Sequence, residues 1–550
     1  MNTESLADAL FPDIKDSPAA LEARFPKRST TAPVTRFAPS PTGYLHIGGL
    51  LASLVSERFA HQSGGIFFLR IEDTDKEREV PNGIEEIISA FSGFGITFDE
   101  GPTSDTAEKG SYGPYIQSKR ADIYKVYIKE LVRQGKAYPC FCTSDDLSKL
   151  RSEQEAKGAK TGYYADWAKH RALTPEQAAA EAKTKPFVIR LKSSGSETRK
   201  ISFDDCIRGT IEMPENDFDA VIMKADGIPT YHFAHAVDDH LMRTTHVIRG
   251  EEWLSSVPLH LELFATLGFE TPRYAHIAPI MKQDGESRRK LSKRHDPEAA
   301  VRFYHEQGYP VNAVIEYLMN IIDGSFERWR VENPAAVHTE FKFDLSRMSK
   351  SGGLFDMTKL NDVSQNFISR MSAESVYESA LRWAEEFKPD LHALMKEKRE
   401  FTTAVFNIGR GDPKARKDIR TWADVPNILA YCYDELFPSI AGDYVFPATM
   451  SNENLVAFLT AYKNANPDMS THDSWYKAVL DIATGMGFAP DMKTFKKNPG
   501  VYKGQPGELM MSLRIAVLKI KESPDLYSMF SAMGHERARA RIDICLNKLR

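Results

Sequence analysis

The sequence predicts an α/β domain that is interrupted by an α+β insertion and followed by an all-helical region. Residues 34–73 have the pattern of a strand, a helix and a second strand, which is typical of a parallel sheet. Between residues 136 and 232 this pattern stops, and beyond residue 300 helical patterns dominate. At 550 residues the chain is too long for one compact core, so several domains are expected.

The α/β domain is expected to follow an amphipathic extension, residues 1–33. The segment VTRFA (34–38) is predicted as a short buried strand, and GIFFLRIED (65–73) as a second strand parallel to it. GGLLASLVSERFAHQ (48–62) is predicted as the helix between them, because apolar residues share one face at i, i+4 spacing: Leu50, Leu51, Leu54, Val55 and Phe59. The two further helices expected in this half are 81–94 and 118–134.

The insertion contains a helical stretch rich in Ala, Lys and Glu. Two of its segments, FVIRLKSS (187–194) and DAVIMKADGIPTYHFA (219–234), are predicted as strands. THVIRG (245–250) and the helical run VPLHLELFATLGF (257–269) then resume the α/β pattern. A Gly-rich segment, SKSGGLFD (349–356), interrupts the helices that follow.

Composition excludes several classes of protein. The chain has 42% hydrophobic and 27% charged residues and a net charge of −5. This net charge gives no overall attraction to nucleic acid or to an anionic membrane, so any site for a polyanion must be a local basic patch. Five cysteines form no disulfide framework and suit a reducing compartment. The N-terminus lacks the charged and apolar regions of a secretory signal, and no apolar run approaches the ~18 residues of a membrane span. A cytoplasmic protein is expected.

The stretch RFAPSPTGYLHIGG (36–49) lies where the first strand turns into the first helix. Gly43 and Gly48 have the spacing of a P-loop, but the lysine and hydroxyl that must follow are absent. The G-x-G-x-x-G spacing of a dinucleotide-binding turn is absent as well. What remains is the imidazole of His46 beside free N–H groups at a helix N-terminus, a place that favours a phosphate.

A second basic motif, RRKLSKR (288–294), follows the resumed α/β pattern. Taken alone, such a run is most often a solvated face or a generic polyanion patch. The two motifs together are far more specific than either alone. RFAPSPTGYLHIGG resembles the HIGH-type signature of class I aminoacyl-tRNA synthetases in the version typical of glutamyl-tRNA synthetases, and KLSKR resembles the KMSKS loop of the same class.

The resemblance implies a Rossmann-like catalytic domain that activates glutamate with ATP and Mg²⁺ and transfers it to tRNA. His46, Lys290 and Lys293 would be catalytic, with the lysines on the departing pyrophosphate. The residues implied to contact ATP are His46, Gly48, Glu252, Met281, Lys290, Leu291, Ser292, Lys293 and Arg294.

Two arginines, Arg36 and Arg249, follow predicted strands at their carboxyl ends, where open α/β sheets bind ligands. An arginine can pair with a carboxylate through two hydrogen bonds, although a structural ion pair is the commoner role of an arbitrary arginine. The segments RIEDTD (70–75), PTYHFAHAVDDHLM (229–242) and THVIRGEEWLSSVP (245–258) are also similar to glutamyl-tRNA synthetases. By this resemblance the glutamate pocket comprises Arg36, Ala38, Ser40, Glu72, Tyr231, His235 and Arg249.

Glu72 and His235 differ in the charge that they would bring to this pocket. Glu72 would bind the substrate ammonium, as its charge suits. His235 departs from the family, in which this position is often asparagine, and its charge near pH 7 would depend on its neighbours.

The segment CFC (140–142) raises the question of zinc, since some glutamyl enzymes carry C-x-C followed about 25 residues later by C-x-H in the inserted domain. Here that spacing reaches Trp167 and Lys169, and His170 lies one place late. A structural zinc is therefore not expected. Instead, the two thiols should be packed, with Trp167 and Tyr164 filling the space of the metal.

The resemblance also divides the chain and suggests its RNA partner. Acceptor-stem binding would fall to the insertion and anticodon binding to a helical region of the bacterial type. The last segment, HERARARIDICLNKLR (535–550), carries a net charge of +3. The partner would be tRNA(Glu), bound before glutamate is activated, and a monomer is the family default; whether tRNA(Gln) is charged too stays open. The expected divisions are 1–33, extension; 34–135, first catalytic half; 136–232, insertion; 233–300, second catalytic half; 301–370, stem-contact region; 371–550, anticodon-binding region.

Three other functions stay open at this stage. A glutaminyl enzyme is disfavoured by the helical C-terminal half, and a truncated paralogue that modifies a tRNA base is disfavoured by the length of 550 residues. A non-catalytic tRNA-binding relative would lose the signatures, whereas His46, Lys290 and Lys293 are present.

Overall fold

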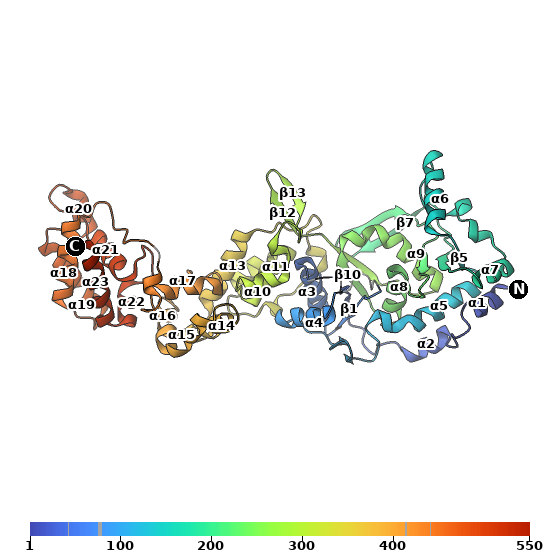
Figure 1. Ribbon diagram of the computed structural model, residues 1–550, viewed down its shortest axis with the longest axis horizontal. Coiled ribbons are helices and arrows are strands. Elements are labelled where there is room, and N and C mark those ends of the chain that lie inside the picture. The colour runs from blue at the N-terminus through green and yellow to red at the C-terminus, as the bar shows by residue number, and fades with distance from the viewer. Residues whose placement is uncertain (42, 44, 75–79, 413–414, 441) are drawn as a thin grey trace. The chain divides into compact units, whose positions relative to one another are not determined.

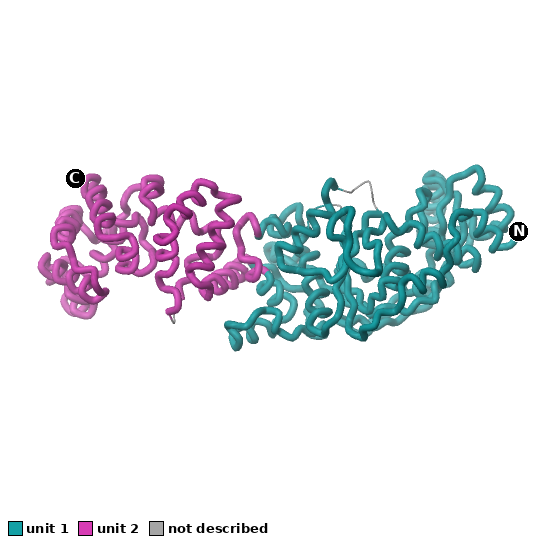
Figure 2. The backbone as a smooth tube through the Cα atoms, turned by 90° about the horizontal axis from the view of Figure 1, so that it is seen from below, with its two compact units in different colours: residues 1–304, 315–356 teal, residues 305–314, 357–550 magenta. Residues whose placement is uncertain are grey.

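The structure is a computed structural model of the chain, and it describes residues 1–41, 43, 45–74, 80–412, 415–440 and 442–550. Two residues of the first motif, Thr42 and Tyr44, and the last residue of RIEDTD, Asp75, lie outside the described residues. The chain forms two compact units, shown in Figure 2. The first comprises residues 1–304 and 315–356, and the second residues 305–314 and 357–550.

The predicted strand–helix–strand at the start of the first unit is confirmed. Strand β1 (Val34–Phe37) pairs in parallel with β2 (Ile66–Leu69), in a register that runs from Val34↔Ile66 to Phe37↔Leu69. Helix α3 (Ile47–His61) connects them and packs on both strands. Its apolar face is buried because the residues at i, i+4 spacing turn toward the sheet.

A second sheet lies beside β1. The backbone N–H of Thr245 donates to Val34 O at 2.9 Å, which brings β10 (His246–Gly250) next to β1. Strand β10 pairs in parallel with β11 (Arg273–Ile277). The residues at and just after the carboxyl ends of these strands therefore gather at one edge, as the α/β pattern predicts.

The insertion has its own antiparallel sheet, β5 (Ala137–Cys140), β6 (Val188–Leu191) and β9 (Val221–Met223). It also contributes two strands to the sheet of β10 and β11, which has the order β10-β11-β7-β8. Strand β7 (Lys200–Asp205) meets β11 at Asp205↔Tyr274, and β8 (Gly209–Pro214) forms the edge. The insertion is thus joined to the catalytic half by strand pairing.

The prediction of a strand over 219–234 is wrong in its last part. Strand β9 ends at Met223, and helix α8 (Tyr231–Leu241) begins after Thr230. Proline at 229 cannot continue a strand ladder, and Thr230 has the extended backbone of a helix N-cap. Helical periodicity then buries Phe233, Ala234 and Val237, which a strand would have placed on opposite faces.

The N-terminal extension packs as part of the first unit. Helices α1 (Thr3–Leu10) and α2 (Pro18–Arg24) both contact α5 (Ala121–Arg133). Their apolar faces enter a core shared with α5 and α8, and Arg28 pairs with Glu100 at 2.7 Å. The extension therefore stabilises the first unit.

The other helices up to residue 332 are α4 (Gly83–Gly93), α6 (Ser144–Ala156), α7 (Pro175–Ala182), α9 (Val257–Leu267), α10 (Val301–Glu306), α11 (Val311–Ile322) and α12 (Ser325–Glu332). Two short hairpins complete the strands: β3 (Gly101–Pro102) with β4 (Glu108–Lys109), and β12 (Met281–Asp284) with β13 (Ser287–Lys290). The β12–β13 hairpin projects from the body of the first unit (Figure 1).

Helices are the regular structure of the second unit in its described part, as predicted, and irregular segments connect them. Its buried core includes Trp475, Leu513 and Phe530. The basic C-terminal helix contributes structurally, because Arg541 is buried and pairs with Asp434 at 2.8 Å. Within the described residues, no helix has the length and apolar character needed to cross a membrane.

The helices of the second unit from residue 357 onward are α13 (Met357–Arg370), α14 (Ala373–Phe387), α15 (Pro389–Glu397), α16 (Arg399–Asn407), α17 (Val425–Ala430), α18 (Asn452–Ala465), α19 (His472–Gly485), α20 (Met492–Lys497), α21 (Pro506–Leu518), α22 (Leu526–Met533) and α23 (His535–Leu549).

Candidate functional site

A cavity of 350 Å³ lies in the first unit at the carboxyl ends of the catalytic strands. Part of each predicted set lines it. From the glutamate set and the ATP set, the lining residues are Arg36, Ala38, Glu72, Tyr231, Arg249, His46, Gly48, Glu252, Lys290 and Leu291. The predicted residues that are not part of this lining are Ser40, His235, Met281, Ser292, Lys293 and Arg294.

His46 is the N-cap of α3. Its Nδ1 accepts a hydrogen bond from the backbone N–H of Gly48 at 2.9 Å, so the ring is fixed at the positive end of a 15-residue helix. Burial lowers the pKa of His46, and the charges of Lys293 and Lys290 lower it further. The imidazole is therefore neutral at pH 7, and it lines the same cavity as the ammonium-bearing Lys290, an arrangement that suits a polyphosphate.

Gly48 keeps the space beside this imidazole open. A Cβ at this position would lie 3.2 Å from His46 Nδ1. Any side chain would press on the ring and narrow the space beside the helix terminus.

The KLSKR loop begins at the end of the β12–β13 hairpin. Lys290 Nζ lies 3.7 Å from Glu252 Oε2, and both side chains are more than half exposed. The base of the loop is fixed, because buried Asp296 accepts hydrogen bonds from Ser292 N at 2.9 Å and from Arg289 Nη1 at 2.6 Å. Leu291 is buried as well, so the lysines extend from an anchored base.

Arg249, on β10, is buried among neutral acceptors. Its Nε donates to His276 Nε2 at 3.1 Å, and its Nη2 is 3.2 Å from His260 Nδ1. Its Nη1 donates to Tyr231 Oη at 3.4 Å. Among the described side chains no carboxylate forms an ion pair with Arg249. A buried guanidinium whose described contacts are all neutral is well suited to an anionic ligand.

A buried cluster of charges surrounds the other predicted contacts of glutamate. Arg36 Nε lies 3.2 Å from Asp239 Oδ1, and Arg70 joins Asp239 (2.7 Å) to Glu72 (3.0 Å). Burial raises the pKa of Glu72, while the charges of Arg70 and Arg36 oppose the rise. These contacts hold the Glu72 carboxylate in place at the cavity wall, where it can accept an ammonium group.

His235 lies wholly buried behind the cavity wall. Its ring stacks on that of Tyr231, with centroids 6.0 Å apart, and its Nδ1 is 2.7 Å from Asp239 Oδ2. Burial lowers the pKa of His235 to about 3, so the ring is neutral at pH 7. His235 contacts Tyr231, which does line the cavity, and can act on the site through it.

Sequence reasoning missed several residues of this site. Asp239 and Arg70 organise the charges, and two further histidines, His260 and His276, hold Arg249. Asp239 could have been found, because an acidic residue on an otherwise apolar helix face, four residues after His235, points to a buried partner. The histidines carry no such local signal.

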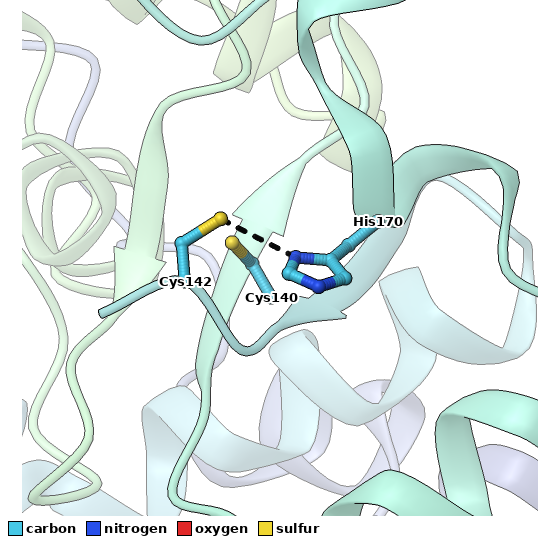
Figure 3. Close-up of side chains that lie close together, drawn as sticks. All are labelled: Cys140, Cys142 and His170. Carbon is cyan, nitrogen blue, oxygen red and sulfur yellow. Dashed lines mark hydrogen bonds between the residues drawn. The ribbon is translucent and has the colours of Figure 1, made fainter. Parts of the chain in front are cut away.

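The two thiols of the CFC segment lie with an imidazole, as Figure 3 shows. Ligand atoms of Cys140, Cys142 and His170 are all within 4.8 Å of one another, and Cys142 Sγ lies 3.5 Å from His170 Nδ1. His170 therefore lies beside the two thiols although it is one place late for the C-x-H spacing. Short 3₁₀ turns at residues 165–167 and 169–172 bring the ring back to the thiols.

The residue beside this cluster is Tyr163, and Tyr164 packs elsewhere, on Phe218. Tyr163 Oη is 3.7 Å from Cys142 Sγ and 3.3 Å from His170 Nδ1. Trp167 packs against the apolar cluster that includes Cys140 and Tyr163. Hydrogen bonds from Cys142, Tyr163 and His170 lower the pKa of Cys140 to about 4, against the opposing effect of burial. One thiolate is thus favoured within the cluster.

Comparison with known proteins bears on the whole chain. Residues 33–362 match the family described as tRNA synthetases class I (E and Q), catalytic domain. A glutamate–tRNA ligase of Clostridium perfringens (strain 13 / Type A) is 48% identical over 546 residues, which is 98% of this chain and all of that protein. The glutamate–tRNA ligase of Acetivibrio thermocellus is 45% identical over 98% of this chain and 99% of its own.

A solved structure is similar over nearly the same length. The glutamate tRNA ligase of Elizabethkingia meningosepticum CCUG26117, determined in complex with its amino acid, superposes with a TM-score of 0.75. It is 28% identical, and the match covers 94% of this chain and all of that one. The similarity therefore extends through the helical C-terminal half.

Proposed function

The chain belongs to the glutamate–tRNA ligases of the class I tRNA synthetase family, and from this premise we propose that one cavity holds glutamate and ATP side by side. The observation that carries the proposal is the lining of the 350 Å³ cavity. Arg249 and Glu72, which suit an amino acid, share it with His46 and Lys290, which suit a phosphate. Two reactants held in one cavity react without the entropic cost of meeting in solution.

Arg249 would bind the side-chain carboxylate of glutamate. The α-carboxylate must remain nucleophilic, so a strong paired contact is better placed on the carboxylate that does not react. Glu72 would accept the ammonium group, with Arg36 and Asp239 holding the charges around it. Tyr231 and the segment around Ala38 and Ser40 would close this end, with His235 supporting Tyr231 from behind.

In the first step an oxygen of the α-carboxylate attacks the α-phosphorus of ATP, and the bond from that phosphorus to the β-phosphate oxygen breaks. Neutral His46 would steady the transferring phosphoryl group, and Lys290 and Lys293 would neutralise the leaving pyrophosphate. Mg²⁺, which is generally used with ATP in this class, would be carried in largely by the phosphates. No protein nucleophile is needed, because positioning and charge supply the rate.

The other predicted contacts of the nucleotide are arranged around this step. Gly48 would let the phosphates approach the helix terminus, and Glu252 and Met281 would flank the adenosine. Leu291, Ser292 and Arg294 would complete the loop. In the second step the 2′-hydroxyl of the terminal adenosine of tRNA attacks the carbonyl carbon, and AMP leaves.

Aminoacylation with radiolabelled glutamate and purified tRNA(Glu) tests the reaction. We expect charging that requires ATP, and pyrophosphate exchange that requires tRNA. Parallel reactions with purified tRNA(Gln) measure discrimination between the two tRNAs. If neither tRNA is charged in an ATP-dependent reaction, the proposed function is contradicted.

We further propose that Cys140, Cys142 and His170 hold a zinc ion, with Tyr163 beside the fourth position. Tetrahedral zinc with sulfur and nitrogen ligands separates them by about 3.5 Å, which matches the Cys142–His170 distance of 3.5 Å. Both cysteines would bind the metal as thiolates, and His170 would bind it through a ring nitrogen that carries a lone pair.

Metal analysis by mass spectrometry checks this prediction. The purified protein should contain about one zinc per chain, and Cys142→Ser should lose most of it. Cys206→Ser is the matched control, because Cys206 is a half-buried cysteine outside the cluster. A zinc content near zero in the unmodified protein would overturn the proposal.

A further inference from the structure

The contacts of Arg249 fix the protonation of two histidines. A guanidinium donates hydrogen bonds and never accepts them. His276 Nε2 and His260 Nδ1, the two ring nitrogens that face Arg249, must therefore carry lone pairs. Each ring can donate only through its other nitrogen. For His260 that donor is Nε2, which lies 2.9 Å from His232 Nδ1.

Asp205 holds His276 in the tautomer that this requires. Asp205 Oδ2 accepts from the backbone N–H of His276 at 3.0 Å and lies 2.7 Å from His276 Nδ1. A carboxylate accepts, so Nδ1 carries the proton, and Nε2 keeps its lone pair for Arg249. Burial lowers the pKa of His276, against the opposing effect of Asp205, which keeps the ring neutral at pH 7.

Asp205 is itself fixed on its other side. Its Oδ1 accepts from the backbone N–H groups of Ile207 and Arg208, both at 2.9 Å. Hydrogen bonds from His276 and these amides outweigh burial and lower the pKa of Asp205, so it is a carboxylate at pH 7. The hydrogen bonds to both oxygens fix the carboxylate in one orientation, in which Oδ2 faces His276.

Asp205 comes from a different part of the chain than Arg249. It ends β7, within the inserted segment, and reaches His276 only because β7 pairs with β11. Arg249 lies on β10, and its register partner on β11 is His276. The inserted segment is therefore connected to the cavity wall through a chain of three buried side chains.

We propose that Asp205 and His276 are positioning residues that set the orientation of Arg249 and thereby the affinity for glutamate. The proposal rests on the proposed role of Arg249 as the ligand of the substrate carboxylate. Neither residue is in the cavity lining, so both act through Arg249. Because Asp205 belongs to the insertion, this contact is also a route by which the insertion can bias the glutamate pocket.

A pair of substitutions at one position tests the proposal. In His276→Gln the side-chain oxygen can take the place of Nε2 and still accept from Arg249. In His276→Asn the amide can take the place of Nδ1 and pair with Asp205, but Arg249 Nε loses its acceptor. We expect KM for glutamate to rise about tenfold or more in His276→Asn and less than about threefold in His276→Gln, with kcat and the KM for ATP little changed.

Asp205→Asn provides a second test with almost no change of shape. Its amide would donate to His276 Nδ1 and drive the proton to Nε2, which would then face the N–H of Arg249. We expect KM for glutamate to rise as in His276→Asn. If one of these variants fails to fold, as judged by its melting temperature, the other still decides the question.

Two outcomes would overturn the inference. Equal KM increases in His276→Asn and His276→Gln would show that the ring only fills space, and an unchanged KM in Asp205→Asn would show that the tautomer does not matter. Arg249→Gln, measured in parallel, separates the positioning role of Asp205 and His276 from the proposed function of Arg249. If Arg249→Gln leaves KM for glutamate unchanged, the role of Arg249 fails; if it raises KM while the other variants do not, only the positioning role fails.

Discussion

Replacing Lys293 with alanine is expected to slow the formation of glutamyl-adenylate about 10²–10³-fold while changing tRNA affinity less than about twofold. The physical reason is the charge on the leaving group. As the bond from the α-phosphorus breaks, negative charge builds up on the pyrophosphate oxygens, and an ammonium group held beside them stabilises that charge more than the ground state.

The structure gives two supports for choosing Lys293. Its charge and that of Lys290 both lower the pKa of His46, so the lysines lie near the ring that caps α3. The loop that carries them is anchored by Asp296 through Ser292 N, so the side chains can reach the nucleotide from a fixed base.

Pyrophosphate exchange in the presence of tRNA measures the first quantity, and filter binding of tRNA measures the second. Arg288→Ala is the matched control, because Arg288 is an exposed cation on the same hairpin outside KLSKR. Exchange that survives intact in Lys293→Ala would refute the role. A parallel loss in Arg288→Ala would show that the general charge of the hairpin is responsible.

The sequence predicted the parts of the fold that depend on local pattern. The apolar stripe of 48–62 predicted α3, and the short apolar runs before and after it predicted two parallel strands. The signatures in these segments also named residues that lie together in one cavity, among them Arg36, His46 and Glu72, since motif residues at strand and helix ends occupy fixed places in an α/β sheet. Their roles in binding stay a prediction.

What the sequence did not predict depends on contacts between distant segments. Asp205 meets His276 only through the pairing of β7 with β11, and no spacing along the chain signals this. His170 is one place late for the C-x-H spacing, but 3₁₀ turns in the intervening segment place its ring beside the two thiols. The segment at 231–234 looked like a strand because aromatic and apolar residues favour both structures, and the N-cap and tertiary burial decided for a helix.

The second large effect is expected from Arg249→Gln, which should lower kcat/KM for glutamate about 10²–10³-fold, mostly through KM. The guanidinium is buried, and in the described part of the chain it contacts only neutral acceptors, so its charge is available to a ligand. A glutamine can hydrogen-bond but cannot neutralise a carboxylate, which would then be buried without a counter-charge.

The same reasoning predicts a change in specificity. Glutamate and glutamine share an α-carboxylate, so loss of a contact to that group would weaken both alike. A contact to the side-chain carboxylate favours glutamate alone, and its loss should reduce the preference for glutamate over glutamine. Steady-state kinetics with both amino acids measure this ratio, and Arg273→Gln, an exposed arginine on neighbouring β11, is the control. If Arg249→Gln lowers kcat/KM for glutamate and for glutamine by the same factor, Arg249 holds the α-carboxylate. If it lowers kcat/KM for glutamate alone, the guanidinium selects the charge of the substrate side chain. The histidines around Arg249 then serve to keep the guanidinium charge unpaired until glutamate binds.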